Sequence, residues 1–158
     1  MAAPVSTVPS VKRYLAEQIQ SALNELPIIP GLPAPIVVYD APGLYRPNDI
    51  IAVGQVYQRY VKQMAMVGSG GAGWLQEDYE IEIVTDVFRA GETLQIDAYE
   101  RAWLLNSLVE EVFRADPSLG GRVIVSRSDF SIDGSQWEKD HKGWMVNVVN
   151  RFKILARI

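Results

Sequence analysis

Apolar residues recur along this chain with two different periods, and the longer period predicts two helices. In residues 10–26 the apolar positions are spaced by three and four, which is the pattern of an amphipathic helix with Ser10 as its N-cap. A second helix is predicted from the turn at residues 91–93, with Thr93 as its cap, to Asp116, because Pro117 disfavours helical geometry in the residue before it. Its apolar stripe consists of Leu94, Ala98, Trp103, Leu104, Leu105, Leu108, Val109, Val112 and Phe113.

The shorter period and clusters of β-branched residues predict five strands. These strands lie at residues 36–39, 50–67, 78–88, 122–132 and 144–158. Gly54 within the second strand suggests a β-bulge or a close approach of another backbone. The last strand has the clearest alternation, and Asn150 is the only polar residue on its apolar face.

The order of these elements is helix, strand, hairpin, helix, hairpin. It predicts an α+β fold with a mixed or antiparallel twisted sheet and both helices packed on one face, in a single domain over residues 1–158. Four prolines make residues 27–35 a stiff connector. Residues 50–88 are predicted to form a long hairpin with a Gly-rich loop at 68–73.

The composition is that of an ordinary globular protein, with 158 residues, 48% of them hydrophobic and 22% charged. The formal net charge is −4 and the basic residues are scattered, which argues against tight binding to a nucleic acid backbone. The absence of cysteine excludes disulfides, thiolate metal sites and thiol nucleophiles. With no signal peptide and no long apolar run, we expect a soluble protein made in a cytoplasm, with no membrane partner.

Gly68, Gly70 and Gly73 have the spacing G-x-G-x-x-G of a dinucleotide-binding loop. Such a loop holds phosphate at the N-terminus of a helix that follows at once. Here Trp74 and an alternating, acidic strand follow instead, and no Walker A lysine is present. The loop is therefore interpreted as a flexible hairpin connection, with no nucleotide and no other cofactor.

One segment has the spacing of a calcium loop. Asp129, Ser131, Asp133, Gly134 and Asp140 match its positions 1, 3, 5, 6 and 12, although position 12 lacks the usual glutamate and the flanks are predicted strands. A polar hairpin loop explains the same residues, so the alternatives stay open and we assign no metal ligand.

The single histidine, His141, lies in a predicted loop before the last strand. No motif of a hydrolase or metalloprotease surrounds it, so we expect no catalytic residues and no enzyme activity.

Three carboxylates, Asp78, Glu80 and Glu82, are predicted to share one face of a strand. Like charges at this spacing repel, so the face is solvated, paired with cations or part of a charged surface. Arg59 and Lys62 on the preceding strand lie across from them in some registers.

Two strings carry a resemblance to a known family. EIEIVTDVFRAGETLQIDAYERAWLLNSLVEEVFRADPSLGGRVIVS reads as strand, glycine turn, long helix and D-P-S-L-G-G exit, and GWMVNVVNRFKILARI closes the chain as an alternating strand. With the order of elements, these strings make the chain resemble the tail terminator (neck, or tail completion) proteins of long-tailed bacteriophages.

The resemblance implies a virion protein, assembled in the bacterial host cytoplasm, that forms a hexameric ring. Such a ring caps the tail tube, meets the head–tail connector or stopper on its other side, and leaves a channel through which DNA passes without specific binding. The family has no catalytic residues. Other readings of the same pattern are a head–tail stopper or adaptor protein and a small α+β ligand- or calcium-binding domain.

Two hypotheses follow about interaction residues. Residues 67–76, including Gly68, Gly70, Gly73 and Trp74, would be a mobile loop that orders on contact with the tail tube or the head connector. Asp78, Glu80 and Glu82 would lie near the lumen, where like charge repels passing DNA.

Overall fold

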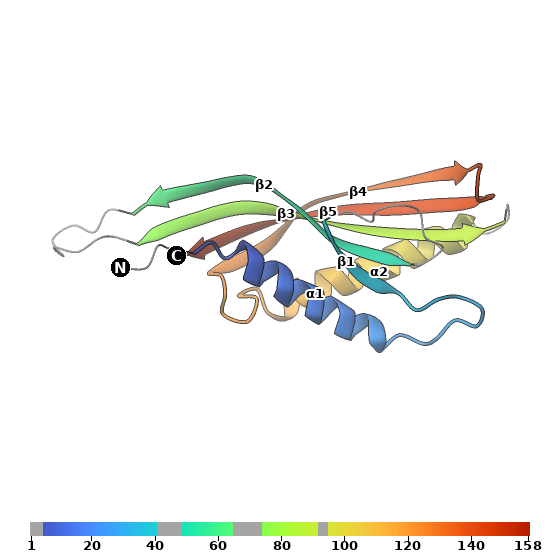
Figure 1. The fold of residues 1–158 in the computed structure, drawn as a ribbon, viewed down its shortest axis with the longest axis horizontal. Coiled ribbons are helices and arrows are strands. Elements are labelled where there is room, and N and C mark those ends of the chain that lie inside the picture. Colours follow the sequence, from blue (N-terminus) through green and yellow to red (C-terminus); the bar gives the residue numbers. More distant parts are fainter. Residues whose placement is uncertain (1–4, 41–48, 65–73, 92–94) are drawn as a thin grey trace.

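Two helices lie side by side across one face of a strongly curled sheet in the computed structural model, which describes residues 5–40, 49–64, 74–91 and 95–158 (Figure 1). The elements in chain order are α1 (Val8–Asn24), β1 (Ile36–Asp40), β2 (Ile50–Gln63), β3 (Leu75–Ala90), α2 (Gln95–Ala115), β4 (Val125–Glu138) and β5 (Gly143–Arg157).

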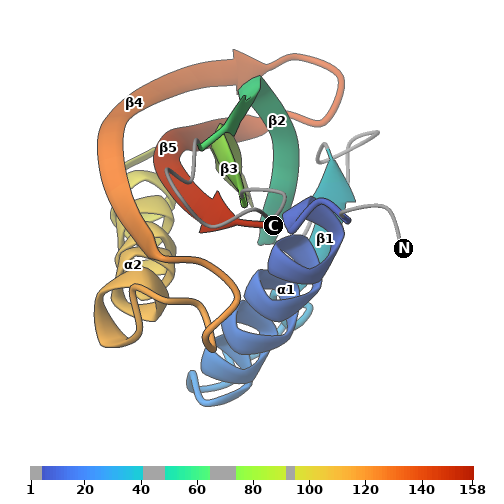
Figure 2. The same cartoon turned by 90° about the vertical axis from the view of Figure 1, so that its left-hand side faces the viewer.

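The sheet has five strands in the order β1-β2-β3-β5-β4. It is mixed, because β1 runs parallel to β2 while the other neighbours are antiparallel. Figure 2 shows how far the sheet curls over its uncovered face, although it does not close into a barrel. The predicted α+β class, with two helices on one face of the sheet, is confirmed.

The two central strands, β3 and β5, form the floor of the core. They pair from Gln76 opposite Arg157 to Ala90 opposite Gly143, and alternate side chains on each are buried toward the helices. The predicted alternation of β5 is confirmed, and its one polar residue on this face, Asn150, is fully buried. Asn150 donates to Asn106 of α2 at 3.1 Å and accepts from Ser131 of β4 at 3.0 Å, so the amide is hydrogen-bonded inside the core.

Helix α1 begins earlier than predicted. It starts at Val8 after Thr7, and Pro9 fits the first turn because proline needs no N–H partner there. The prediction of Ser10 as N-cap is wrong: Ser10 lies inside the helix, and its hydroxyl donates to the carbonyl of Thr7 at 2.9 Å.

Helix α2 ends at Ala115, as the Asp116-Pro117 pair predicts. Its buried stripe is turned slightly from the predicted one, because Ala102 and Asn106 face the core while Leu104 is 46% exposed. The predicted cap Thr93 and the stripe residue Leu94 lie outside the described residues.

In the β2–β3 hairpin, the register shifts between Val53 and Val56, and this confirms the bulge predicted at Gly54. The Gly-rich tip at residues 68–73 lies outside the described residues.

The second hairpin corrects the sequence interpretation. The strand predicted at 122–132 ends too early, because β4 is extended and paired with β5 up to Glu138. Most of residues 129–140, for which the sequence leaves a polar loop and a calcium loop as alternatives, therefore belong to this strand. Asp129 lies 3.7 Å from Lys153, while Asp133 accepts from Tyr99 of α2 on the helix-covered face. The two carboxylates therefore lie on opposite faces of a strand and do not form a calcium loop.

Asp49, just before β2, ties three elements together. Its carboxylate accepts from Arg89 of β3 at 2.7 Å and from Arg101 of α2 at 2.8 Å. Asp49 is only 4% exposed, and both guanidinium groups are nearly buried as well. Burying these three charged groups costs desolvation free energy. Such a cluster stabilises the fold only when its ion pairs and hydrogen bonds have good geometry.

Candidate functional site

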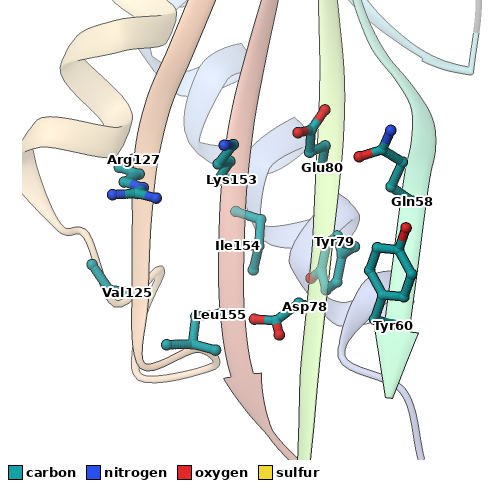
Figure 3. Close-up of a pocket in the computed structure, with 10 residues that line it drawn as sticks. All are labelled: Gln58, Tyr60, Asp78, Tyr79, Glu80, Val125, Arg127, Lys153, Ile154 and Leu155. Atoms are coloured by element: carbon teal, nitrogen blue, oxygen red, sulfur yellow. The ribbon is translucent and has the colours of Figure 1, made fainter. Parts of the chain in front are cut away.

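The face of the sheet that the helices leave uncovered is hollowed, and this hollow is the candidate site. Its volume is about 500 Å³, and Figure 3 shows side chains from four strands standing around it. The residues that line the hollow are Gln58, Tyr60, Asp78, Tyr79, Glu80, Val125, Arg127, Lys153, Ile154 and Leu155.

Charge is divided across the hollow. Arg127 of β4 and Lys153 of β5 are register partners and form a basic side, while Asp78 and Glu80 of β3 form an acidic side. Lys153 lies directly opposite Glu80 in the ladder between β5 and β3. Opposite charges at adjacent strand positions stabilise the pairing of the sheet, so much of this charge is compensated within the chain.

Arg151 of β5 contacts residues of three other strands on the uncovered face. Its guanidinium nitrogens lie 3.6 Å from Glu80 and 3.6 Å from Glu82. The same guanidinium lies over the ring of Tyr57 from β2, at 4.2 Å, and near the ring of Phe130 from β4, at 5.5 Å. These contacts join β2, β3, β5 and β4 across the curl of the sheet. The two contacts with rings are cation–π interactions, in which the guanidinium is attracted to the face of the ring.

The contacts of Arg151 show how the charge of two of the three carboxylates on β3 is balanced. Asp78, Glu80 and Glu82 do share the uncovered face of β3, as predicted. The cation opposite the two glutamates comes from β5, while Arg59 of β2 pairs with a different residue. Glu80 and Glu82 are therefore paired with a cation, which is one of the outcomes expected for this face, and their position near a lumen stays a prediction.

The partner of Arg59 is Glu77, a buried carboxylate that the sequence pattern does not single out. Glu77 is fully buried on the helix-covered face, 2.7 Å from Arg59. Its oxygens also accept from Ser6 and Thr7, which anchors the chain just before α1. Burial alone would raise the pKa of Glu77, but the hydrogen bonds from Ser6, Thr7 and Arg59 outweigh it and hold the pKa below its ordinary value.

The pKa of Asp86, further along β3, is shifted in the opposite direction, above its ordinary value. It stands across from Ile50 and Asn147, and burial raises the pKa of Asp86 to about 6. A carboxyl whose folded pKa exceeds its unfolded pKa near 4 stabilises the fold below pH 4 and loses that contribution as the pH rises through 6.

Replacing Asp86 with asparagine is therefore expected to raise the free energy of unfolding at pH 7, with the gain shrinking as the pH falls to 4. Urea denaturation of both proteins at a series of pH values measures the difference. Asp140→Asn, in the exposed turn after β4, removes the same charge and serves as the control. A gain at pH 7 that is equal for both variants would show that net charge, and not burial of Asp86, is responsible.

The remaining residues predicted for interaction are only partly described. Gly68, Gly70 and Gly73 lie outside the described residues, as does most of residues 67–76. Trp74 is half-buried, and the guanidinium of Arg157 lies 4.9 Å from its ring centroid. Trp74 thus packs against the end of β5 beside the hairpin tip.

His141 lies in the turn between β4 and β5, where a loop is predicted. Its ring meets Phe88 edge-on at 6.4 Å, and Nδ1 is 4.0 Å from Glu138. Among the described residues, no group of three or more histidine, aspartate or glutamate side chains is placed to hold a metal ion. In the same part of the chain, no helix is long and apolar enough to cross a membrane.

The basic side of the hollow and the central Arg151 are what the sequence analysis missed. Arg127, Arg151 and Lys153 do stand at the polar positions of two alternating strands, but only the register brings them beside Glu80 and Glu82. The fold and this face define the class of the molecule: an α+β protein whose mixed five-stranded sheet has one face under two helices and the other face open. No family model matches the chain, and a search of curated proteins finds no significant match either.

Proposed function

We propose that this chain is a structural protein of a bacteriophage virion, a tail terminator that forms a ring on the end of the tail tube. The ring ends tail elongation and joins the tube to the head–tail connector around a channel for DNA. In this proposal the protein is not an enzyme and carries no cofactor.

The observation that carries the proposal is the position of the two strings behind the resemblance. The first runs from β3 through α2 into the start of β4, and the second is β5. Together they make the centre of the fold, because β3 and β5 pair along their whole length and α2 packs on both. The resemblance thus rests on one continuous structural unit rather than on scattered segments.

The uncovered face also fits a protein that works by contact. Its charged groups are largely paired with one another, as the ion pairs of Arg151 illustrate. Lys153 and Arg151 each have an acidic partner beside them, so the described part of this face offers no basic track for a nucleic acid backbone. This is in keeping with a channel through which DNA slides without being held.

Light scattering on the purified protein, together with electron microscopy of tail tubes assembled with and without it, tests the proposal. We expect a hexamer in solution, or a monomer that forms rings on the ends of tubes made by the tail tube protein of the same genome. The tubes should stop growing when the protein is present. A monomer that never associates with tube ends would overturn the proposal.

The alternatives separate in the same experiment. A protein that binds the head-side connector but leaves tube growth unchanged would be a stopper or adaptor. A rise in melting temperature on adding calcium, with no assembly, would favour a small ligand-binding domain.

A further inference from the structure

The sheet has two long edges that no further strand of the described residues covers, although the backbone N–H of Ser126 at the start of β4 donates to the carbonyl of Pro117 at 2.8 Å. One edge is β4, at the end of the strand order. The other is the second part of β2, residues 55–63, because β1 ends at Asp40 opposite Gly54. An open edge presents a row of backbone N–H and C=O groups, which is a template for pairing with another strand.

Apolar side chains are exposed to solvent along both edges. On β4, Phe130 is 40% and Ile132 is 60% exposed, and nearly the whole strand is accessible. On the β2 edge, Tyr60 is 57% and Val61 is 43% exposed. Exposed apolar residues along a strand edge are typical of a surface that another protein covers.

The charges of the two edges are opposite in sign. Residues 125–138 contain three acidic side chains and one basic side chain, while residues 55–63 contain two basic side chains and no acidic one. The ion pair of Arg59 with Glu77 and that of Asp129 with Lys153 lie within the chain.

The two edges still differ in the sign of their charge when the residues of these two ion pairs are left out. Lys62 remains on the β2 edge, and the β4 edge retains Asp133 and Glu138 against Arg127. Two β4 edges would bring like charge together, whereas a β4 edge and a β2 edge attract.

We propose that copies of this chain join edge to edge, with β4 of one copy pairing with residues 55–63 of β2 in the next. The two surfaces differ, so two joined copies still have one unused β4 edge and one unused β2 edge between them, and the contact repeats until a ring closes. The inference rests on the proposed function, which requires a ring, and names the surface that builds it. Strand addition of this kind supplies backbone hydrogen bonds for affinity and side-chain pairs for register.

Introduced cysteines test the pairing directly, because the chain has none of its own. One set of single variants places cysteine on β4 (Ser128→Cys, Ile132→Cys, Gln136→Cys), and a second set places it on β2 (Tyr60→Cys, Lys62→Cys, Gln63→Cys); all six positions are exposed. Paired strands bring opposed Cα atoms to about 5 Å, within the distance that a disulfide spans. Glu17→Cys, on the exposed side of α1, is the control.

Each β4 variant is mixed with each β2 variant, with tail tubes added if the free protein is monomeric, and the products are separated on a non-reducing gel after oxidation. We expect at least one β4–β2 combination to give a covalent dimer, while each variant alone and every mixture with Glu17→Cys stays monomeric. The matching double variant should give a ladder that ends at the number of subunits in the ring.

The outcomes distinguish a wrong interface from a wrong proposed function. If the unmodified protein forms rings but no β4–β2 combination crosslinks, or if one β4 variant crosslinks with itself, the edge pairing is wrong and the ring remains. If the unmodified protein forms no ring even on tail tubes, both proposals fall.

Discussion

Replacing Asp49 with alanine is expected to lower the free energy of unfolding by about 3–5 kcal/mol. Within the described residues, Asp49 is the carboxylate that pairs with both Arg89 and Arg101, at 2.7 and 2.8 Å, and all three groups are shielded from water. Removal of the carboxylate leaves two guanidinium groups close together without a counter-charge. The variant should therefore lose the connection among β2, β3 and α2, and urea denaturation followed by circular dichroism measures the change.

Glu111→Ala is the matched control for this variant. It also removes the carboxylate partner of an arginine, Arg114, but both side chains are largely exposed on α2. Water solvates Arg114 after the substitution, so no measurable change in stability is expected. If Asp49→Ala were equally silent, the two arginines would be able to reach water, and the buried cluster would not hold the elements together.

Replacing Phe152 with alanine is expected to cost about 3–5 kcal/mol of stability. Phe152 is 1% exposed, and its ring lies parallel to that of Phe113 with centroids 3.6 Å apart. The stack joins β5 to the last turn of α2, so alanine removes apolar burial and leaves a cavity that neighbouring main chain is too rigid to fill. Thermal or urea unfolding of the purified variant measures the loss.

Phe130→Ala makes the same chemical change at a position that is 40% exposed on the β4 edge. Its cost should stay below about 1 kcal/mol, because the ring has much less apolar surface to lose from the interior. A variant at Phe130 as unstable as Phe152→Ala would mean that the uncovered face contributes to the core.

The alternating strands and the helix ends could be predicted from sequence because their signals are local. The alternation of β5 places Asn150 on the core face, and Pro117 marks the end of α2. The strand β4 could not be predicted over its full length for a physical reason. It is an edge strand with polar residues on both faces, so residues 129–138 lack the apolar alternation that a half-buried strand shows.

The arrangement of the site depends on long-range pairing. Arg151 meets Glu80 and Glu82 only because β5 inserts between β3 and β4, which reverses the order expected from sequence neighbours. The start of α1 has a similar cause. Thr7, just before the helix, is hydrogen-bonded to the carboxylate of Glu77, which is distant in the sequence. No local capping motif in residues 7–10 predicts that contact.

The anchor at Glu77 also determines where a tag can be placed. Ser6 and Thr7 are held near the beginning of β3, and Ile158 exchanges backbone hydrogen bonds of 2.9 and 3.1 Å with Leu75, so the described part of the chain begins and ends at one end of the molecule (Figure 1). The turn at residues 139–142 lies at the opposite end, where Gly143 pairs with Ala90. A fluorescent or gold label fused to either terminus therefore reports the same pole of every subunit, and a single labelled sample is enough to orient the chain in an image of any assembly.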